Sequence, residues 1–126
     1  WNAKRELSKI NYRIHTDAIK RNLIPSKLTK EQTNIVYAEE ADVLNMALFG
    51  ITSKKWKSEN PDKTGNIRDY ASIDELICLS NLENLNSVFI NDGISQSERL
   101  KRLNSIAISQ MKILSEANIK YLKNNN

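Results

Sequence analysis

The densest group of acidic side chains lies at Glu39, Glu40 and Asp42. Several carboxylates on one wall are what a two-metal nuclease requires. On a helix, however, Glu39 and Asp42 are one turn apart, whereas Glu40 points in another direction. We therefore expect these acids to lie on a helix surface and pair with Lys or Arg. A metal-dependent nuclease stays as a remote alternative.

A second polar group occurs in the segment that begins at Gly65. The planar guanidinium of Arg68 can hold a carboxylate through two hydrogen bonds. We predict that Arg68 pairs with Asp42, or with another acid on the second helix, and so pins this loop to the core. The alternative is that Asn66, Arg68 and Trp56 face a partner, because tryptophan often anchors interfaces. The candidate interaction or loop-anchoring cluster is Asp42, Trp56, Asn66, Arg68 and Asp69.

Other reactive residue types are scarce. His15 is the single histidine and Cys78 the single cysteine, whereas a typical metal centre needs three or four converging ligands. We expect His15 to be structural or superficial, and Cys78 to be a buried, inert thiol. The three glycines stand apart from one another, so no phosphate-binding glycine loop is present. We therefore predict no catalytic residue, no metal, no cofactor and no small-molecule substrate.

Positive charge is concentrated at the start of the chain. The net charge is +4, but residues 1–30 carry eight Lys or Arg against Glu6 and Asp17. Such a segment can attract nucleic acid through its long-range field, although a solvated helix face is the simpler interpretation. The candidate basic face consists of Lys4, Arg5, Lys9, Arg13, Lys20 and Arg21.

The elements that position these residues are predicted to be helices. Only three Gly and two Pro interrupt the chain, and no strand-like alternation is sustained. Apolar residues at steps of three and four predict a long first helix over residues 2–22, which Pro25 would stop. The sequence thus predicts an all-α fold, a compact bundle of about five to six helices with long first and last helices.

Three capping boxes mark the starts of later helices, at Thr29–Gln32, Ser72–Glu75 and Ser95–Glu98. The helix from Thr29 runs to Gly50, with Ile35 and Val36 among its apolar residues and a possible break near residues 37–38. A short helix near residues 53–59 carries Trp56, and residues 60–68 form the one substantial loop. The last helix places Leu100, Leu103, Ala107, Met111 and Leu114 on one face.

Length and composition fit one domain. We expect a single helical domain over residues 1–123 and a frayed tail at residues 124–126. No apolar run approaches the roughly twenty residues that cross a bilayer, and a lone cysteine suits a reducing cytoplasm. Because the chain begins at Trp1 rather than Met, we expect it to be a fragment of a longer protein.

Several runs of residues resemble one family. They are Asn11–Lys20, Tyr37–Asn45, Ala47–Gly50 and Gly65–Ala71, extended by Asn81–Glu83, Arg99–Leu100 and Gln110–Met111. Together they resemble the C-terminal helical region of bacterial KilA-N domain-containing proteins over about residues 7–114. The KilA-N domain itself, a phage-type DNA-binding module, lies upstream in those proteins and is not seen in this sequence.

The resemblance implies a phage-like regulatory context, with DNA bound through the absent upstream domain. It assigns no catalytic or DNA-contacting residue to this chain. We therefore expect a non-enzymatic protein-interaction or oligomerisation module, acting as a homo-oligomer in the cytoplasm. Direct nucleic-acid binding through the basic first helix is the alternative.

Overall fold

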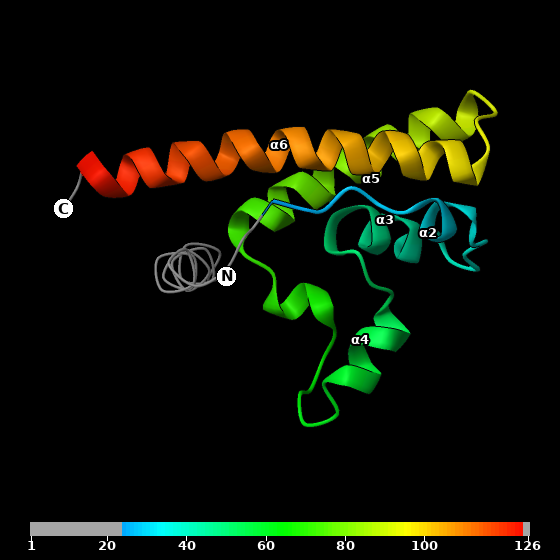
Figure 1. Ribbon diagram of the computed structural model, residues 1–126, viewed down its shortest axis with the longest axis horizontal. Helices are drawn as coiled ribbons and strands as arrows, with labels where there is room; N and C mark the ends of the chain where they lie inside the picture. Colours follow the sequence, from blue (N-terminus) through cyan, green and yellow to red (C-terminus); the bar gives the residue numbers. More distant parts are fainter. Residues whose placement is uncertain (1–23, 125–126) are drawn as a thin grey trace, which may run out of the picture.

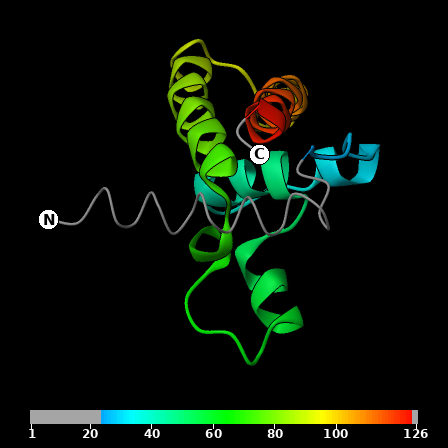
Figure 2. The ribbon, with the colours of Figure 1, turned by 90° about the vertical axis from the view of Figure 1, so that its left-hand side faces the viewer.

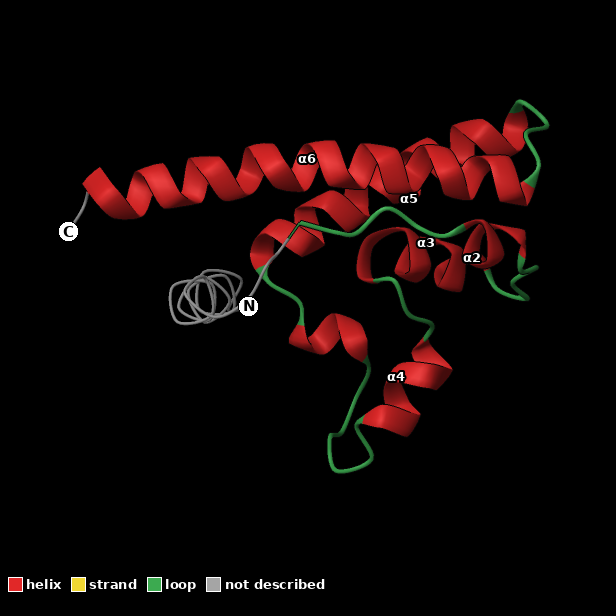
Figure 3. Cartoon of the chain, in the orientation of Figure 1, coloured by secondary structure: helices red, strands yellow, loops and turns green. Residues whose placement is uncertain are grey.

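The computed structural model describes residues 24–124, and this part consists of helices joined by loops (Figures 1 and 3). No strand occurs within these residues, so the predicted all-α class and compact helical bundle are confirmed. The predicted first helix lies outside the described residues. The elements are α2 (Lys30–Asn34), α3 (Glu40–Phe49), α4 (Ser53–Glu59), the 3₁₀ helix η1 (Ile67–Tyr70), α5 (Ile73–Asn91) and α6 (Gln96–Asn124).

Capping side chains begin the helices where the sequence predicts. Thr29 and Ser72 each form both hydrogen bonds of a capping box, with Gln32 and Glu75 respectively. At Ser95 the hydroxyl accepts from Glu98 N at 3.3 Å, while the Glu98 carboxylate forms an ion pair with a neighbouring arginine of α6. Each cap satisfies a backbone N–H that the first helical turn cannot pair internally.

The predicted break in the second helix is real. The chain is non-helical from Ile35 to Glu39, with extended dihedral angles at these two residues, and this segment separates α2 from α3. Gln96 stabilises this segment, because its side chain accepts from Tyr37 N at 2.7 Å and donates to Tyr37 O at 2.9 Å. The expectation that Ile35 and Val36 belong to a helix is wrong. They lie in the break and are exposed, Val36 at 86%.

The core lies where α3, α5 and α6 meet. Helices α5 and α6 form an antiparallel pair, and α3 packs across both of them (Figures 1 and 2). The predicted apolar face of α6 is buried at four positions, and Leu114 packs at its margin. The core side chains are Tyr37, Val43, Leu44, Met46, Ala47, Leu48, Cys78, Leu79, Leu82, Leu100, Leu103, Ala107 and Met111.

Helix α4 and η1 form an arm that projects from the three-helix core (Figure 1). The predicted short helix starts after Thr52, whose hydroxyl accepts from Lys55 N at 3.3 Å. The predicted loop over residues 60–68 is shorter than expected, because η1 already begins at Ile67. Among the described residues, no helix is both long enough and apolar enough to cross a membrane.

Candidate functional site

A polar network joins the start of α6 to α3 and α5. Arg99 is 8% exposed, and its Nη1 donates to Asn86 Oδ1 at 2.8 Å and to the Glu40 carboxylate. Its Nε donates to the carbonyl of Ile94 at 3.0 Å. Asn86 Nδ2 in turn donates to Glu40 Oε1 at 2.9 Å. We call these residues and Gln96 the anchor network, because they fix three helices to one another.

The anchor network has a consistent electrostatic effect. The hydrogen bond from Arg99 lowers the pKa of Glu40 below its ordinary value of 4.5, against the opposing effect of burial. Hydrogen bonds from Asn86 and Gln96 lower the pKa further. Glu40 is therefore an ionised partner of a buried cation, and nothing in this arrangement makes it an acid or base for a reaction.

Asn104 fixes the chain before α2 to the same body. Its Nδ2 donates to Ala47 O at 2.9 Å and to Ser26 O at 3.1 Å, and its Oδ1 accepts from Leu28 N at 3.0 Å. Ala47 lies in the last turn of α3, where backbone carbonyls lack helical partners. A single buried amide thus satisfies three backbone groups from two segments.

A second polar group, the arm cluster, consists of Asp42, Asn45, Ser53, Arg68 and Glu83. Asp42 Oδ1 accepts from Ser53 N at 3.0 Å, so it satisfies a backbone N–H at the start of α4. Asn45 Nδ2 donates to Ser53 Oγ at 3.0 Å, and its Oδ1 accepts from Arg68 Nε at 3.4 Å. Arg68 Nη1 forms an ion pair with Glu83 Oε1 at 3.0 Å.

The predicted pairing of Arg68 with Asp42 is wrong. Asp42 is already directed at α4, and Asn45, one turn further along α3, lies between it and the guanidinium. Arg68 pairs instead with Glu83 of α5, whereas the predicted partner was an acid of the second helix. The broader expectation holds, since Arg68 does attach its loop to the helical core. Its Nη2 is buried without a hydrogen-bond partner.

The other members of the predicted cluster have local roles. Trp56 is 8% exposed and packs against Tyr70, with the ring centroids 5.4 Å apart and the ring planes tilted by 37°, so its side chain is buried within the arm. Asn66 and Asp69 cap η1: Asn66 Oδ1 accepts from Arg68 N at 2.9 Å, and Asp69 Oδ2 accepts from Asn66 N at 2.8 Å. These contacts define the shape of the arm.

Several predicted residues lie outside the described part of the chain. They are His15 and the whole candidate basic face, Lys4, Arg5, Lys9, Arg13, Lys20 and Arg21. The expectations attached to them stay predictions.

The described residues contain little that suits a reaction. Glu40 and Asp42 point to different partners, and residues 24–124 hold no group of three or more His, Cys, Asp or Glu that could bind a metal ion. Cys78 is fully buried, and burial raises the pKa of its thiol to about 11. The predicted burial of the Cys78 thiol is therefore confirmed, and its inertness stays a prediction.

The anchor network and the role of Asn104 were not predicted from the sequence. A signal was present: Arg99 and Asn104 fall within the apolar face of the last helix, and Asn86 follows Leu82 by one turn. A polar residue at a core position needs a partner, because burying it unpaired is costly. The pattern could have marked these residues as buried, although not which groups they contact.

No family model, curated protein or solved structure matches this chain.

Proposed function

We propose that this chain is a protein-interaction and oligomerisation module, a helical body that docks rather than reacts. The observation that carries the proposal is the number of large apolar side chains that remain exposed to solvent although the core of the molecule is well packed. Covering such surface is favourable by about 25 cal/mol per Å². Within the part of the chain that the structure describes, six large apolar side chains are exposed by 44% or more: Ile35, Val36, Ile77, Val88, Ile90 and Ile113.

The polar chemistry of the described residues supports the same proposal. The anchor network, Asn104 and the arm cluster are all used to hold helices and loops in place. Rigid presentation of a surface lowers the entropic cost of binding, because fewer groups must be ordered on association. Such a body suits a docking role.

The regulatory context comes from the family resemblance alone. Residues 7–114 resemble the region that follows a KilA-N domain, so we propose that the chain serves a DNA-associated regulatory protein and that DNA is bound by a separate upstream domain.

Sedimentation velocity of the 126-residue chain tests the docking proposal. We expect a concentration-dependent shift from monomer to a larger species between about 10 and 300 µM, the range in which small interfaces associate. A sedimentation coefficient that stays at the monomer value throughout contradicts the proposal.

Direct nucleic-acid binding is a second candidate, favoured by the position of the net charge. Residues 1–23 hold six basic and two acidic residues, so the other residues hold thirteen of each and are neutral together. Binding through this segment should weaken steeply with salt, because each phosphate contact releases a counterion. Gel-shift experiments at low salt test this binding, and a variant with Lys4, Arg5 and Lys9 changed to Gln is the comparison. If the wild type gives no shift, direct nucleic-acid binding is excluded as the function.

A further inference from the structure

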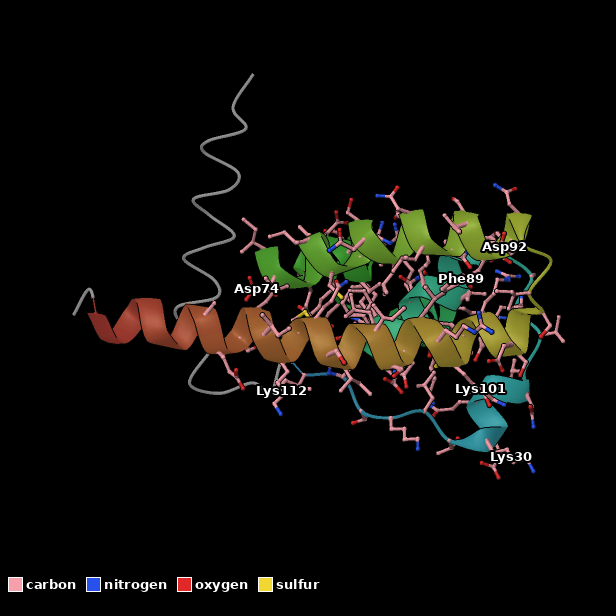
Figure 4. The ribbon with its side chains drawn as sticks, turned by 90° about the horizontal axis from the view of Figure 1, so that it is seen from above. Lys30, Asp74, Phe89, Asp92, Lys101 and Lys112 are labelled. Atoms are coloured by element: carbon pink, nitrogen blue, oxygen red, sulfur yellow. The ribbon has the colours of Figure 1, made fainter. Side chains whose placement is uncertain are left out.

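The outer side of α5 has an unusual composition. No other described element covers the centre of this side, which is turned away from α3 and α6 (Figures 2 and 4), although Asn81 at its edge donates a hydrogen bond to Gln110 of α6. At 100° per residue, the positions within about 60° of Asn84 form one continuous strip. We call this strip the α5 face; its central residues, all exposed, are Ile77, Ser80, Asn81, Asn84, Ser87 and Val88.

The α5 face has no charged side chain. Of the three acids in α5, Asp74 and Glu75 are buried, and Glu83 lies at the flank and pairs with Arg68. The helix has no Lys or Arg, although charged residues make up 27% of the chain. Depletion of charge is typical of the centre of a protein interface. A strip without cations offers nothing to hold a nucleic acid or another polyanion.

The order of residues on the α5 face is self-complementary. Ile77 and Val88 are its exposed apolar side chains, and Asn81 and Asn84 its central amides. Both pairs have the same midpoint, between residues 82 and 83. When two such helices pack antiparallel about a two-fold axis through that midpoint, apolar meets apolar and amide meets amide. A parallel arrangement would instead place each residue opposite its own copy.

We propose that the α5 face of one chain packs antiparallel against the α5 face of a second copy, with the two-fold axis between residues 82 and 83. Ile77 of each copy then packs on Val88 of the other. Asn81 already donates to Gln110 Oε1 at 3.1 Å, which leaves its carbonyl oxygen to accept from Asn84 of the second copy. The inference rests on the proposed docking function and gives it a partner and a register.

The size of the strip sets the strength of the contact. Helix α5 has 19 residues and is therefore about 28 Å long. The strip covers on the order of 300 Å² per chain, against about 800 Å² per partner in a standard stable interface. The dimer is accordingly a weak one, with a dissociation constant on the order of 10 µM or above.

Charge substitutions on the strip provide the first test. Ile77→Glu and Val88→Glu each place a carboxylate in the apolar contact, so each should weaken dimerisation at least about 30-fold by sedimentation equilibrium. The matched control is Ile113→Glu, on the exposed side of α6, which should leave the dimer unchanged. All three side chains are exposed in the chain, so circular dichroism should show an unaltered fold.

Cysteine pairing tests the register. A mixture of Asn81→Cys and Asn84→Cys chains, one carrying a tag, should form a disulfide-linked heterodimer faster than either chain alone forms a homodimer. The native Cys78 does not interfere, because it is fully buried. Faster linkage of Asn84→Cys chains to one another would indicate parallel packing and overturn the inference.

The outcomes separate this inference from the function it rests on. If the wild type associates, and Ile113→Glu abolishes the association while Ile77→Glu and Val88→Glu leave it intact, the α5 contact is overturned. The proposed docking function would still stand in that case. A chain that is monomeric at every concentration removes both.

Discussion

At the scale of single residues, we expect the ion pair of Glu40 and Arg99 to be the most important for stability. Arg99 is 8% exposed, whereas the Glu40 side chain is 43% exposed, so the cation is the more deeply buried partner. If the Glu40 carboxylate is removed, the buried guanidinium of Arg99 loses the ion pair that offsets the free-energy cost of taking it out of water. The pair therefore matters mainly because it neutralises Arg99 at the junction of three helices.

We predict that Glu40→Gln lowers the free energy of unfolding at about pH 7 by roughly 1–2 kcal/mol. The effect is smaller than for a fully buried pair, because the Glu40 carboxylate keeps contact with water. Urea unfolding of the wild type and the variant measures it.

The effect of Glu40→Gln should also depend on pH. The folded-state pKa of Glu40 lies below its ordinary value of 4.5. Its stabilisation is therefore present above that value and is lost as the pH falls through the lowered folded pKa. The two unfolding curves should converge as the pH falls below 4.5 and through the lowered folded pKa of Glu40. A constant difference at every pH contradicts the proposed role of the charge.

Asn104 supports a second prediction at this scale. Asn104→Ala leaves the carbonyl groups of Ala47 and Ser26 and the N–H of Leu28 without their partner. We expect a loss of about 2–3 kcal/mol, since unsatisfied buried polar groups are costly. Ser109→Ala on the exposed side of the same helix is the control, and its unfolding curve should be nearly unchanged. Equal behaviour of the two variants would show that Asn104 contributes nothing specific.

At the scale of elements, the arm is held by local contacts rather than by a large core. Trp56 packs against Tyr70, Asn66 and Asp69 cap η1, and the Tyr70 hydroxyl donates to Thr64 O at 3.0 Å. Segments with few buried contacts open at a lower free energy than the core. The arm should therefore respond to single changes that leave the three-helix core folded.

Gly65→Ala tests the arm. Gly65 has φ +83°, and an added Cβ would lie 2.3 Å from Asp69 Oδ2, so the cap of η1 must shift. The control is Gly93→Ala, where φ is +74° but nothing lies within 4 Å of the added atom. Both variants share the strain of a positive φ, roughly 1 kcal/mol, but only Gly65→Ala should accelerate tryptic cleavage after Lys63. Equal cleavage of both variants would mean that the cap does not depend on this glycine.

The arm also shows how far sequence reasoning reaches at this scale. The short helix α4 was predictable, because capping and helix periodicity are local properties. The partner of Arg68 was not, since Glu83 follows it by fifteen residues on a different helix. Separation along the sequence does not indicate which of several acidic residues will lie close to Arg68 in the folded chain.

At the scale of the whole molecule, Cys78 reports on global unfolding. It lies in the core shared by α3, α5 and α6, and its pKa is raised to about 11, so the native thiol is both inaccessible and protonated at neutral pH. We predict that it reacts with a thiol reagent only as fast as the core opens. Labelling in increasing urea should follow the unfolding curve from circular dichroism. Rapid labelling without denaturant contradicts this burial.

The amino-acid sequence by itself determined the all-α class, most helix starts, the break near Tyr37 and the buried face of α6. These features depend on capping and periodicity, which act over a few residues. Only the tertiary structure decided that Arg99 pairs with Glu40, that Arg68 pairs with Glu83, and that the uncharged side of α5 remains uncovered by the other described helices. Those outcomes depend on how helices distant in sequence are placed, and side-chain types alone do not specify that placement.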